Sequence, residues 1–347
     1  MFLGIEIGGT KLQLGVGLGD GGPLVALERF DVEPQLGAAG ILEQIDAAAT
    51  ILISRHQVSA VGFGFGGPIN AAAGRVIKSH QIDGWEDFPL VDWCRKKLGI
   101  PARLHNDCDV AALAEARYGA GQGRKVVLFV TVGTGIGGGL IIDGRIYRGS
   151  GAGAAEIGHL RPSLNADRED DTIESIASGW GIAAAAQARL ADPMSHPFIS
   201  LTSGLMTTHP EQVRQRLIEA EAAEEEYAAD LLTRCGGKVD QLTAKMVAQA
   251  ATDGNEVARE VLAHACQALG WGIAQALTLL APNVVVIGGG VSLMDESLFL
   301  APLRTQIDRY VFPPLVGHFE VLPAALGERV VVYGALAAAA EVGEVRS

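Results

Sequence analysis

The sequence predicts an α/β protein built from two similar halves, and three observations support this. Each half opens with an apolar strand, a glycine turn and a second strand, at residues 3–18 and 125–142. After each opening, stretches with helical periodicity alternate with short buried strands. The chain of 347 residues is too long for one typical core and comfortable for two. A glycine-rich stretch at 119–125 separates the halves, so we expect the break there.

In the first half, apolar runs bounded by turn residues predict strands, and apolar residues at helical spacing predict helices. The helix predicted over 38–56 carries its apolar residues at that spacing: Ile41, Ile45, Ala48, Ala49 and Leu52. The predicted strands are 3–7, 10–18, 24–32, 58–67 and 102–105, and further helices are 89–98 and 107 onward.

The second half repeats the opening. A strand over 125–132 leads into the glycine turn "GTGIGGG", and a hairpin follows through the type I′-like turn Asp143-Gly144. The remaining predicted elements are a helix over 173–190, two helices within 243–280, a buried strand over 283–290, and helices over 295–311 and 330–340. Residues 192–240 contain no clear strand, so we interpret them as an insertion, with an acidic, exposed helix over 211–232.

Composition and charge exclude several classes of partner. The 27 basic and 40 acidic residues leave a net charge of −13, which disfavours nucleic acid and anionic membranes as partners.

The cysteines and the N-terminus bear on the compartment. Four cysteines lie far apart without a CxxC pair, which favours a reduced compartment and no cysteine-based zinc site. The N-terminus lacks a basic segment and reaches Glu6 early, so we expect no signal peptide. We also expect no membrane span and a cytoplasmic location.

Two common phosphate motifs do not fit the glycine turn of the second half. Residues 133–138 match G-x-G-x-x-G, but a dinucleotide fold needs a helix after this loop, and a hairpin follows instead. A P-loop needs G-K-[ST] after its glycines, and that is absent.

Glycine turns between antiparallel strands favour another arrangement. One such hairpin from each half can hold a polyphosphate from opposite sides, because backbone N–H groups and Thr hydroxyls supply donors. Gly8-Gly9-Thr10-Lys11 would form the first grip and Gly133-Thr134-Gly135 the second. The alternative is that both are ordinary hairpin turns.

Six segments together resemble the ROK family of sugar kinases, from residue 3 to about 340. They are "GIEIGGTK", "LHNDCDVAALAE", "VTVGTGIGGG", "GAAEIGHL", "IESIASG" and "PNVVVIGGGVS". The resemblance implies the two-lobed, actin-like (ribonuclease H-like) ASKHA fold with duplicated mixed-sheet domains, in which ATP and a hexose meet in the cleft. It implies lobes of 1–118, completed by a helix at about 330–347, and 119–329, with the insertion at about 192–240. The family is usually dimeric, so we expect a homodimer.

The resemblance also assigns candidate site residues. By the residues alone, Asp107 fits a helix N-cap as well as a catalytic carboxylate. The family match favours the general base, which accepts the proton of the sugar hydroxyl that attacks the γ-phosphate. The implied sugar-binding positions are Gly66, Gly67, Asn106, Asp107, Glu156, His159 and Glu174. The implied ATP-binding positions are Glu6, Gly8, Gly9, Thr10, Lys11, Thr131, Gly133, Thr134, Gly135, Gly288 and Gly289. Mg²⁺ would arrive with ATP.

Three departures from the family pattern bear on specificity and metal binding. Glu6 stands where the phosphate motif usually has Asp, and Gln81 where relatives commonly carry Asn. In most members the histidine of "EIGH" and three cysteines hold zinc, whereas the segment after His159 has no cysteine here, so we expect no zinc.

The sequence therefore predicts an ATP-dependent kinase that converts a hexose to its 6-phosphate. Glucose is the default substrate, and fructose, mannose and N-acetylhexosamines remain open. The alternative is a non-catalytic sugar sensor of the same family. A DNA-binding repressor is disfavoured because the first phosphate strand begins at residue 3.

Overall fold

The computed structural model describes the chain except for residues 80, 151–152, 192–222 and 345–347. Five strands of the first half form one mixed sheet in the order β3-β2-β1-β4-β7. β1 pairs antiparallel with β2 and parallel with β4, so the chain reverses at the first glycine turn and then crosses over. The strands are β1 (Phe2–Ile7), β2 (Lys11–Gly17), β3 (Ala26–Asp31), β4 (Ala60–Phe65) and β7 (Ala102–Asn106).

The second sheet repeats this arrangement. Its order is β10-β9-β8-β11-β12, with β8 antiparallel to β9 and parallel to β11. This repetition confirms the predicted α/β fold with duplicated mixed sheets. The strands are β8 (Val126–Val132), β9 (Ile136–Ile142), β10 (Arg145–Ile146), β11 (Val284–Gly288) and β12 (Glu320–Pro323). The sequence reading missed β12, because this short edge strand buries only Val321 and carries no alternating pattern.

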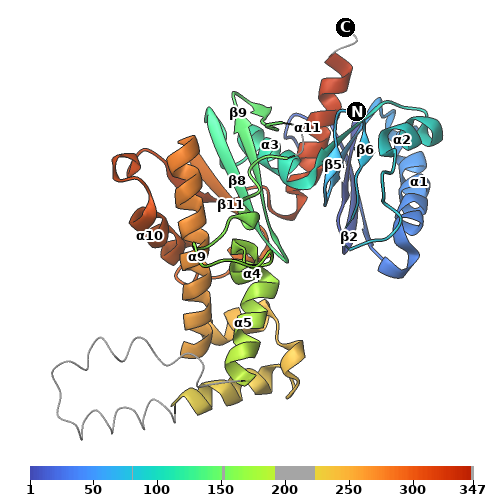
Figure 1. The fold of residues 1–347 in the computed structure, drawn as a ribbon. Coiled ribbons are helices and arrows are strands. Elements are labelled where there is room, and N and C mark those ends of the chain that lie inside the picture. The colour runs from blue at the N-terminus through green and yellow to red at the C-terminus, as the bar shows by residue number, and fades with distance from the viewer. Residues whose placement is uncertain (80, 151–152, 192–222, 345–347) are drawn as a thin grey trace, which may run out of the picture.

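The outer face of the first sheet is covered by α1 (Gly37–His56), with α2 (Leu90–Leu98) beside it (Figure 1). The predicted apolar stripe of α1 is buried at Ile41, Ile45, Ala49 and Leu52. The stretch Pro34–His56 is long and apolar enough for a membrane span by length and composition. Here that stripe packs into the core of the first sheet. A small hairpin, β5 (Ile69–Asn70) and β6 (Arg75–Val76), lies between β4 and α2.

Two helices lie between the sheets (Figure 1): α3 (Asp107–Tyr118) and α11 (Val330–Glu344). The last helix of the chain thus returns to the first sheet, where it contacts β1 and β4, while α3 contacts α11 and the second sheet. Glycines permit this close packing. A Cβ on Gly62 would lie 1.9 Å from the carbonyl oxygen of Ala335, and one on Gly334 would lie 1.8 Å from that of Val110.

Helices pack on the other face of the second sheet. The predicted helix over 173–190 is divided at Ser178, whose backbone is extended (ψ 169°). The helices are α4 (Ile173–Ala177), α5 (Gly179–Ala191), a segment over 223–234, α8 (Ala244–Thr252), α9 (Glu256–Leu280) and α10 (Leu300–Tyr310). The 3₁₀ turns are η1 (Pro34–Leu36), η2 (Ile157–His159), η5 (Val239–Gln241), η6 (Gly290–Leu293), η7 (Pro313–Leu315) and η8 (Gly327–Arg329).

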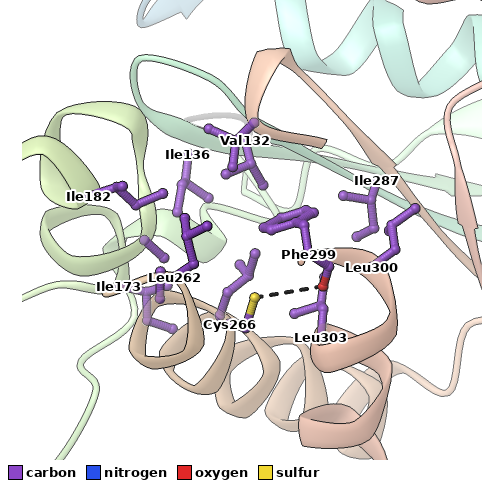
Figure 2. Packing of buried hydrophobic residues seen from close by; sticks show 14 of the residues in the cluster. Val132, Ile136, Ile173, Ile182, Leu262, Cys266, Ile287, Phe299, Leu300 and Leu303 are labelled. Carbon is purple, nitrogen blue, oxygen red and sulfur yellow. Dashed lines mark hydrogen bonds between the residues drawn. The ribbon is translucent and has the colours of Figure 1, made fainter. Parts of the chain in front are cut away.

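Figure 2 shows the core beneath these helices. Ile173 of α4 and Leu262 of α9 pack beside Ile136 of β9, and the Cys266 thiol lies 3.6 Å from the carbonyl oxygen of Phe299. This core fixes α4 and the start of β9 relative to each other.

The described part of the predicted insertion joins the same core. Leu231 and Cys235 are buried, so the helix over 223–234 packs against the second half. The rest of the predicted acidic helix, like most of the insertion, lies outside the described residues.

Candidate active site

A cleft of about 810 Å³ brings together residues of both halves. All the sugar-binding positions implied by the resemblance line it: Gly66, Gly67, Asn106, Asp107, Glu156, His159 and Glu174. So do several of the implied ATP-binding positions: Gly8, Gly9, Thr131, Gly133, Thr134 and Gly135. Residues from distant parts of the sequence thus surround one cavity.

Asp107 lies at the start of α3, but it does not cap the helix. The cap is Asn106, whose side-chain oxygen accepts the N–H groups of Cys108 (2.8 Å) and Asp109 (3.3 Å). The Asn106 amide nitrogen donates to the carbonyl oxygen of Gly67 at 3.2 Å, which ties the cap to the loop after β4. The alternative that Asp107 caps α3 is therefore wrong, and Asp107 lines the cleft.

The environment of Asp107 suits a general base. Loss of solvent raises the pKa of Asp107 to about 6, the N–H of Cys108 opposes this rise, and the Glu6 carboxylate adds to it. A carboxylate with this pKa is mostly ionised at pH 7 and holds a proton more readily than an ordinary Asp.

The two glycine turns close the cleft at the ends of the strand pairs. In the first turn, the Gly8 N–H donates to the Lys11 carbonyl oxygen at 3.0 Å; in the second, Gly133 donates to Gly135 at 2.9 Å. The N–H groups of Gly9, Thr134 and Gly135 have no acceptor in the described part of the chain. Free N–H groups at a turn form a concave anion site.

Glu6 stands behind the first turn rather than in the cleft lining. It is buried on β1, accepts from Gln13 at 2.6 Å and pairs with Lys11 at 3.2 Å. Burial raises the pKa of Glu6 and the Lys11 ammonium opposes the rise. Thr10 and Lys11 are likewise outside the lining.

The opposite wall consists of Glu156, His159 and Glu174. Burial raises the pKa of Glu156, His159 lowers it and the Glu174 carboxylate raises it. Just before Glu156, Ala155 adopts a left-handed conformation (φ 59°), which costs energy for any residue with a Cβ. The wall is thus a carboxylate pair presented by a strained turn and by α4.

Arg161 holds the segment after His159 together through hydrogen bonds to its backbone. The Arg161 guanidinium donates to the carbonyl oxygens of Arg168, Glu169 (2.9 Å) and Asp171 (3.1 Å). Among the described residues, no group of three or more His, Cys, Asp or Glu side chains is placed to hold a metal ion.

The sequence reading missed an ion pair in the cleft. The Asp109 carboxylate lies 3.6 Å from the Arg148 guanidinium, which also contacts the buried ring of His105. Burial raises the pKa of Asp109 to about 6, although Arg148 lowers it, and burial lowers the pKa of His105 to about 3. Asp109 lies in the same motif as Asp107, so its carboxylate could have been predicted from the sequence as a cleft residue. No local sequence pattern indicates that Arg148 lies in the cleft.

A second cavity of about 1150 Å³ adjoins the second turn. Gly133, Thr134 and Trp180 line both cavities. The second cavity is bounded by α5, α8 and η6, with Ala183, Gln187, Thr243, Lys245, Gln249, Gly290 and Met294 among its lining residues. Gly288 and Gly289 do not line it. Gly289 (φ 88°) lies where a Cβ would be 2.4 Å from the Val132 carbonyl oxygen, so it allows close packing on β8.

Comparisons with known proteins agree with this geometry. The ROK family matches residues 2–342. The chain belongs to the ROK family. It is 32% identical to the glucokinase of Halalkalibacterium halodurans, over 96% of this chain and 93% of that protein.

Solved structures extend the match to three dimensions. The ROK glucokinase of Streptomyces griseus, solved with glucose and AMPPNP, has a TM-score of 0.76 at 31% identity, covering 98% of this chain and 99% of that one. The ROK hexokinase of Thermus thermophilus has a TM-score of 0.72 at 26% identity, covering 99% of each chain. The chain is a glucokinase-like ROK sugar kinase with the two-lobed fold of that family.

Proposed function

We propose that this ROK kinase transfers the γ-phosphoryl group of ATP to the 6-hydroxyl of a hexose, with Asp107 as general base and glucose as the default substrate. The observation that carries the proposal is the position of Asp107. It lies in a cleft lined by both glycine turns and by the carboxylates of Glu156 and Glu174. The glucose and AMPPNP of the Streptomyces griseus structure support the same pair of substrates.

The hexose would occupy the cleft of Asp107. Glu156 and Glu174 are acceptors for sugar hydroxyls, because an ionised carboxylate offers about four lone-pair sites and no proton. The nucleotide would occupy the adjoining cavity, with its phosphates directed toward the free N–H groups of the two turns. Thr134 and Gly133, which line both cavities, would then lie where the two substrates meet.

The chemical step follows from this arrangement. The 6-hydroxyl oxygen attacks the γ-phosphorus as its proton passes to a carboxylate oxygen of Asp107, and the bond to the ADP oxygen breaks. The chain supplies alignment and a proton acceptor, since phosphoryl transfer needs little covalent help from the protein.

Mg²⁺ fits the donors that the site offers. This ion is usually held by one or two carboxylates together with substrate phosphates. The candidate carboxylates here are Asp107, which lines the cleft, and Glu6, which lies behind the first turn and pairs with Lys11. It would neutralise phosphate charge during transfer.

The test is an ADP-release assay with Mg-ATP against hexoses, amino sugars and N-acetylhexosamines, with and without a zinc-selective chelator. We expect turnover of at least one hexose that the chelator does not change, and its loss in Asp107→Ala while ATP and sugar binding persist. Full turnover in Asp107→Ala would refute the assignment of the base. Sugar binding without ADP release by the wild-type protein would favour the sensor.

We propose further that the enzyme is a homodimer, on the ground of the family, and that it is cytoplasmic, on the ground of its four cysteines without a CxxC pair. Sedimentation equilibrium would test the assembly, and a monomer at micromolar concentration would contradict it.

A further inference from the structure

The carboxylate of Glu174 joins one wall of the cleft to the second glycine turn. The wall consists of Glu156, His159 and Glu174 and is called the sugar wall below, and the turn over 133–135 is called the phosphate turn. Its Oε2 accepts the N–H of Ile136, the first residue of β9, at 2.7 Å. The contact is close: a Cβ on Gly135 would lie 2.6 Å from the same oxygen. Glu174 therefore rests on the turn that lines both cavities, while it also lines the hexose cleft.

The other carboxylate oxygen of Glu174, Oε1, accepts no hydrogen bond from the residues that the structure describes. Glu174 is half-buried and is near enough to Glu156 to raise the pKa of that carboxyl. One oxygen is thus committed to the phosphate turn, and the other remains available to a hydroxyl donor in the cleft.

The helix that carries Glu174 is anchored on three sides. The Ile173 N–H donates to the Leu160 carbonyl oxygen at 3.0 Å, which joins α4 to the segment of Glu156 and His159. Thr172 and Ser175 form a capping box. Ile173 is fully buried against α9, where a Cβ on Gly272 would lie 2.2 Å from its Cδ1. These anchors leave α4 little freedom to move independently of the sugar wall.

A second bond ties the same region to the turn. The Gly179 N–H, at the start of α5, donates to the Gly133 carbonyl oxygen at 2.7 Å. The turn over 133–135 is thus held at both of its ends, by Glu174 and by Gly179. Within the described residues, the bond between Glu174 and Ile136 is the only hydrogen bond that joins this turn to a side chain of the cleft.

From these contacts we propose that Glu174 is a positioning residue that couples hexose binding to nucleotide binding. A sugar hydroxyl that donates to Oε1 restrains the carboxylate, and the restrained carboxylate holds the Ile136 N–H and the turn in the arrangement that receives the ATP phosphates. Coupling between two ligands is reciprocal, so ATP strengthens hexose binding by the same factor. The inference rests on the proposed function, since it assigns the two cavities to these two ligands.

The experiment measures a coupling factor by calorimetry: the Kd of AMPPNP without glucose divided by its Kd at saturating glucose. Allosteric coupling is typically about 5- to 150-fold, and we expect about tenfold or more for the wild type. Glu174→Ala should reduce the factor to near 1. Glu174→Gln keeps a carbonyl oxygen for the Ile136 N–H, so it should weaken glucose binding but preserve most of the factor.

Two further variants separate coupling from simple loss of a sugar contact. Glu156→Gln removes a carboxylate from the same wall without touching the turn, so the factor at saturating glucose should stay within about twofold of the wild type. Gly135→Ala displaces the Glu174 carboxylate from the other side, and it should lower the factor even if Glu174→Ala does not fold.

A wild-type factor near 1, a normal factor in both Glu174→Ala and Gly135→Ala, or an equal loss in Glu156→Gln would overturn the inference. Failure of the proposed function looks different. A wild-type protein that neither binds nor phosphorylates any hexose would refute that function, and the coupling role would fall with it.

Discussion

Replacement of Glu115 should destabilise the protein more than replacement of any exposed carboxylate. Glu115 lies on α3 and its side chain is 0% exposed. Its Oε2 accepts the N–H of Ala120 at 2.8 Å, and its Oε1 accepts those of Ala325 and Leu326, both at 2.9 Å. These three donors lie on the two segments that connect the first sheet to the second, after α3 and before α11. One carboxylate therefore ties both connections together.

The magnitude follows from the number of donors that would be orphaned. A buried N–H without a partner costs about 1–3 kcal/mol. Glu115→Ala leaves three partly buried N–H groups, which water reaches in part, and a cavity, so we expect a loss of about 3–6 kcal/mol in the free energy of unfolding. Glu115→Gln keeps the shape and one acceptor oxygen, and about 1–3 kcal/mol should be lost because its NH₂ group faces an N–H donor.

Urea unfolding followed by circular dichroism would measure these losses. The matched control is Glu328→Ala, since Glu328 lies near the same connection but its side chain is 73% exposed in a loose pair with Arg29. That change should alter stability by less than about 0.5 kcal/mol. A Glu115→Ala protein within about 1 kcal/mol of the wild type would refute the reasoning.

Three further predictions concern the cleft and the packing. With the pKa of Asp107 at about 6, acid removes the base, so kcat/KM at pH 5 should be about one-tenth of its value at pH 7, and a flat pH profile would contradict this. Gly334→Ala should lower the free energy of unfolding by about 2–3 kcal/mol in urea, because the new Cβ meets the Val110 carbonyl oxygen. This loss should appear although alanine has a better helix propensity than glycine. The control is Gly290→Ala, since nothing lies within 4 Å of a Cβ at Gly290. Ala155→Gly should raise the Tm, because a glycine adopts the left-handed conformation of Ala155 without a cost of about 1–2 kcal/mol. The greater conformational entropy of the unfolded glycine chain offsets about half of this gain. A lower Tm would show that the conformation is not strained.

Local patterns sufficed wherever a feature depends on neighbouring residues. Alternation and turn residues predicted both hairpins, and Asp143 (φ 51°) with Gly144 (φ 75°) adopts the predicted type I′ turn. Helical spacing predicted the buried stripe of α1. The family motifs selected residues that share one cleft because those motifs end strands or begin helices at the same edges of the two sheets.

Contacts between distant segments needed the tertiary structure. The Asp109–Arg148 pair, the bond from Ile136 to Glu174 and the bonds from three N–H groups to Glu115 each join segments that no local pattern relates. The division of the predicted helix at Ser178 had a local signal, since Gly179 and Gly181 follow it and glycine disfavours a helix interior. The hydrogen bond from Gly179 to Gly133 then fixes where α5 begins.

The sequence by itself determined the duplicated α/β plan and the two glycine turns, and its resemblance to the ROK family selected the carboxylates of the cleft. The plan and the turns depend on periodicity and turn preference, which are properties of short stretches. Only the tertiary structure decided which oxygen of Glu174 is committed to the phosphate turn, which residue caps α3, and how closely α11 approaches the first sheet. Those features depend on distances of a few ångströms between surfaces brought together by packing, and such distances are set by all the side chains between them.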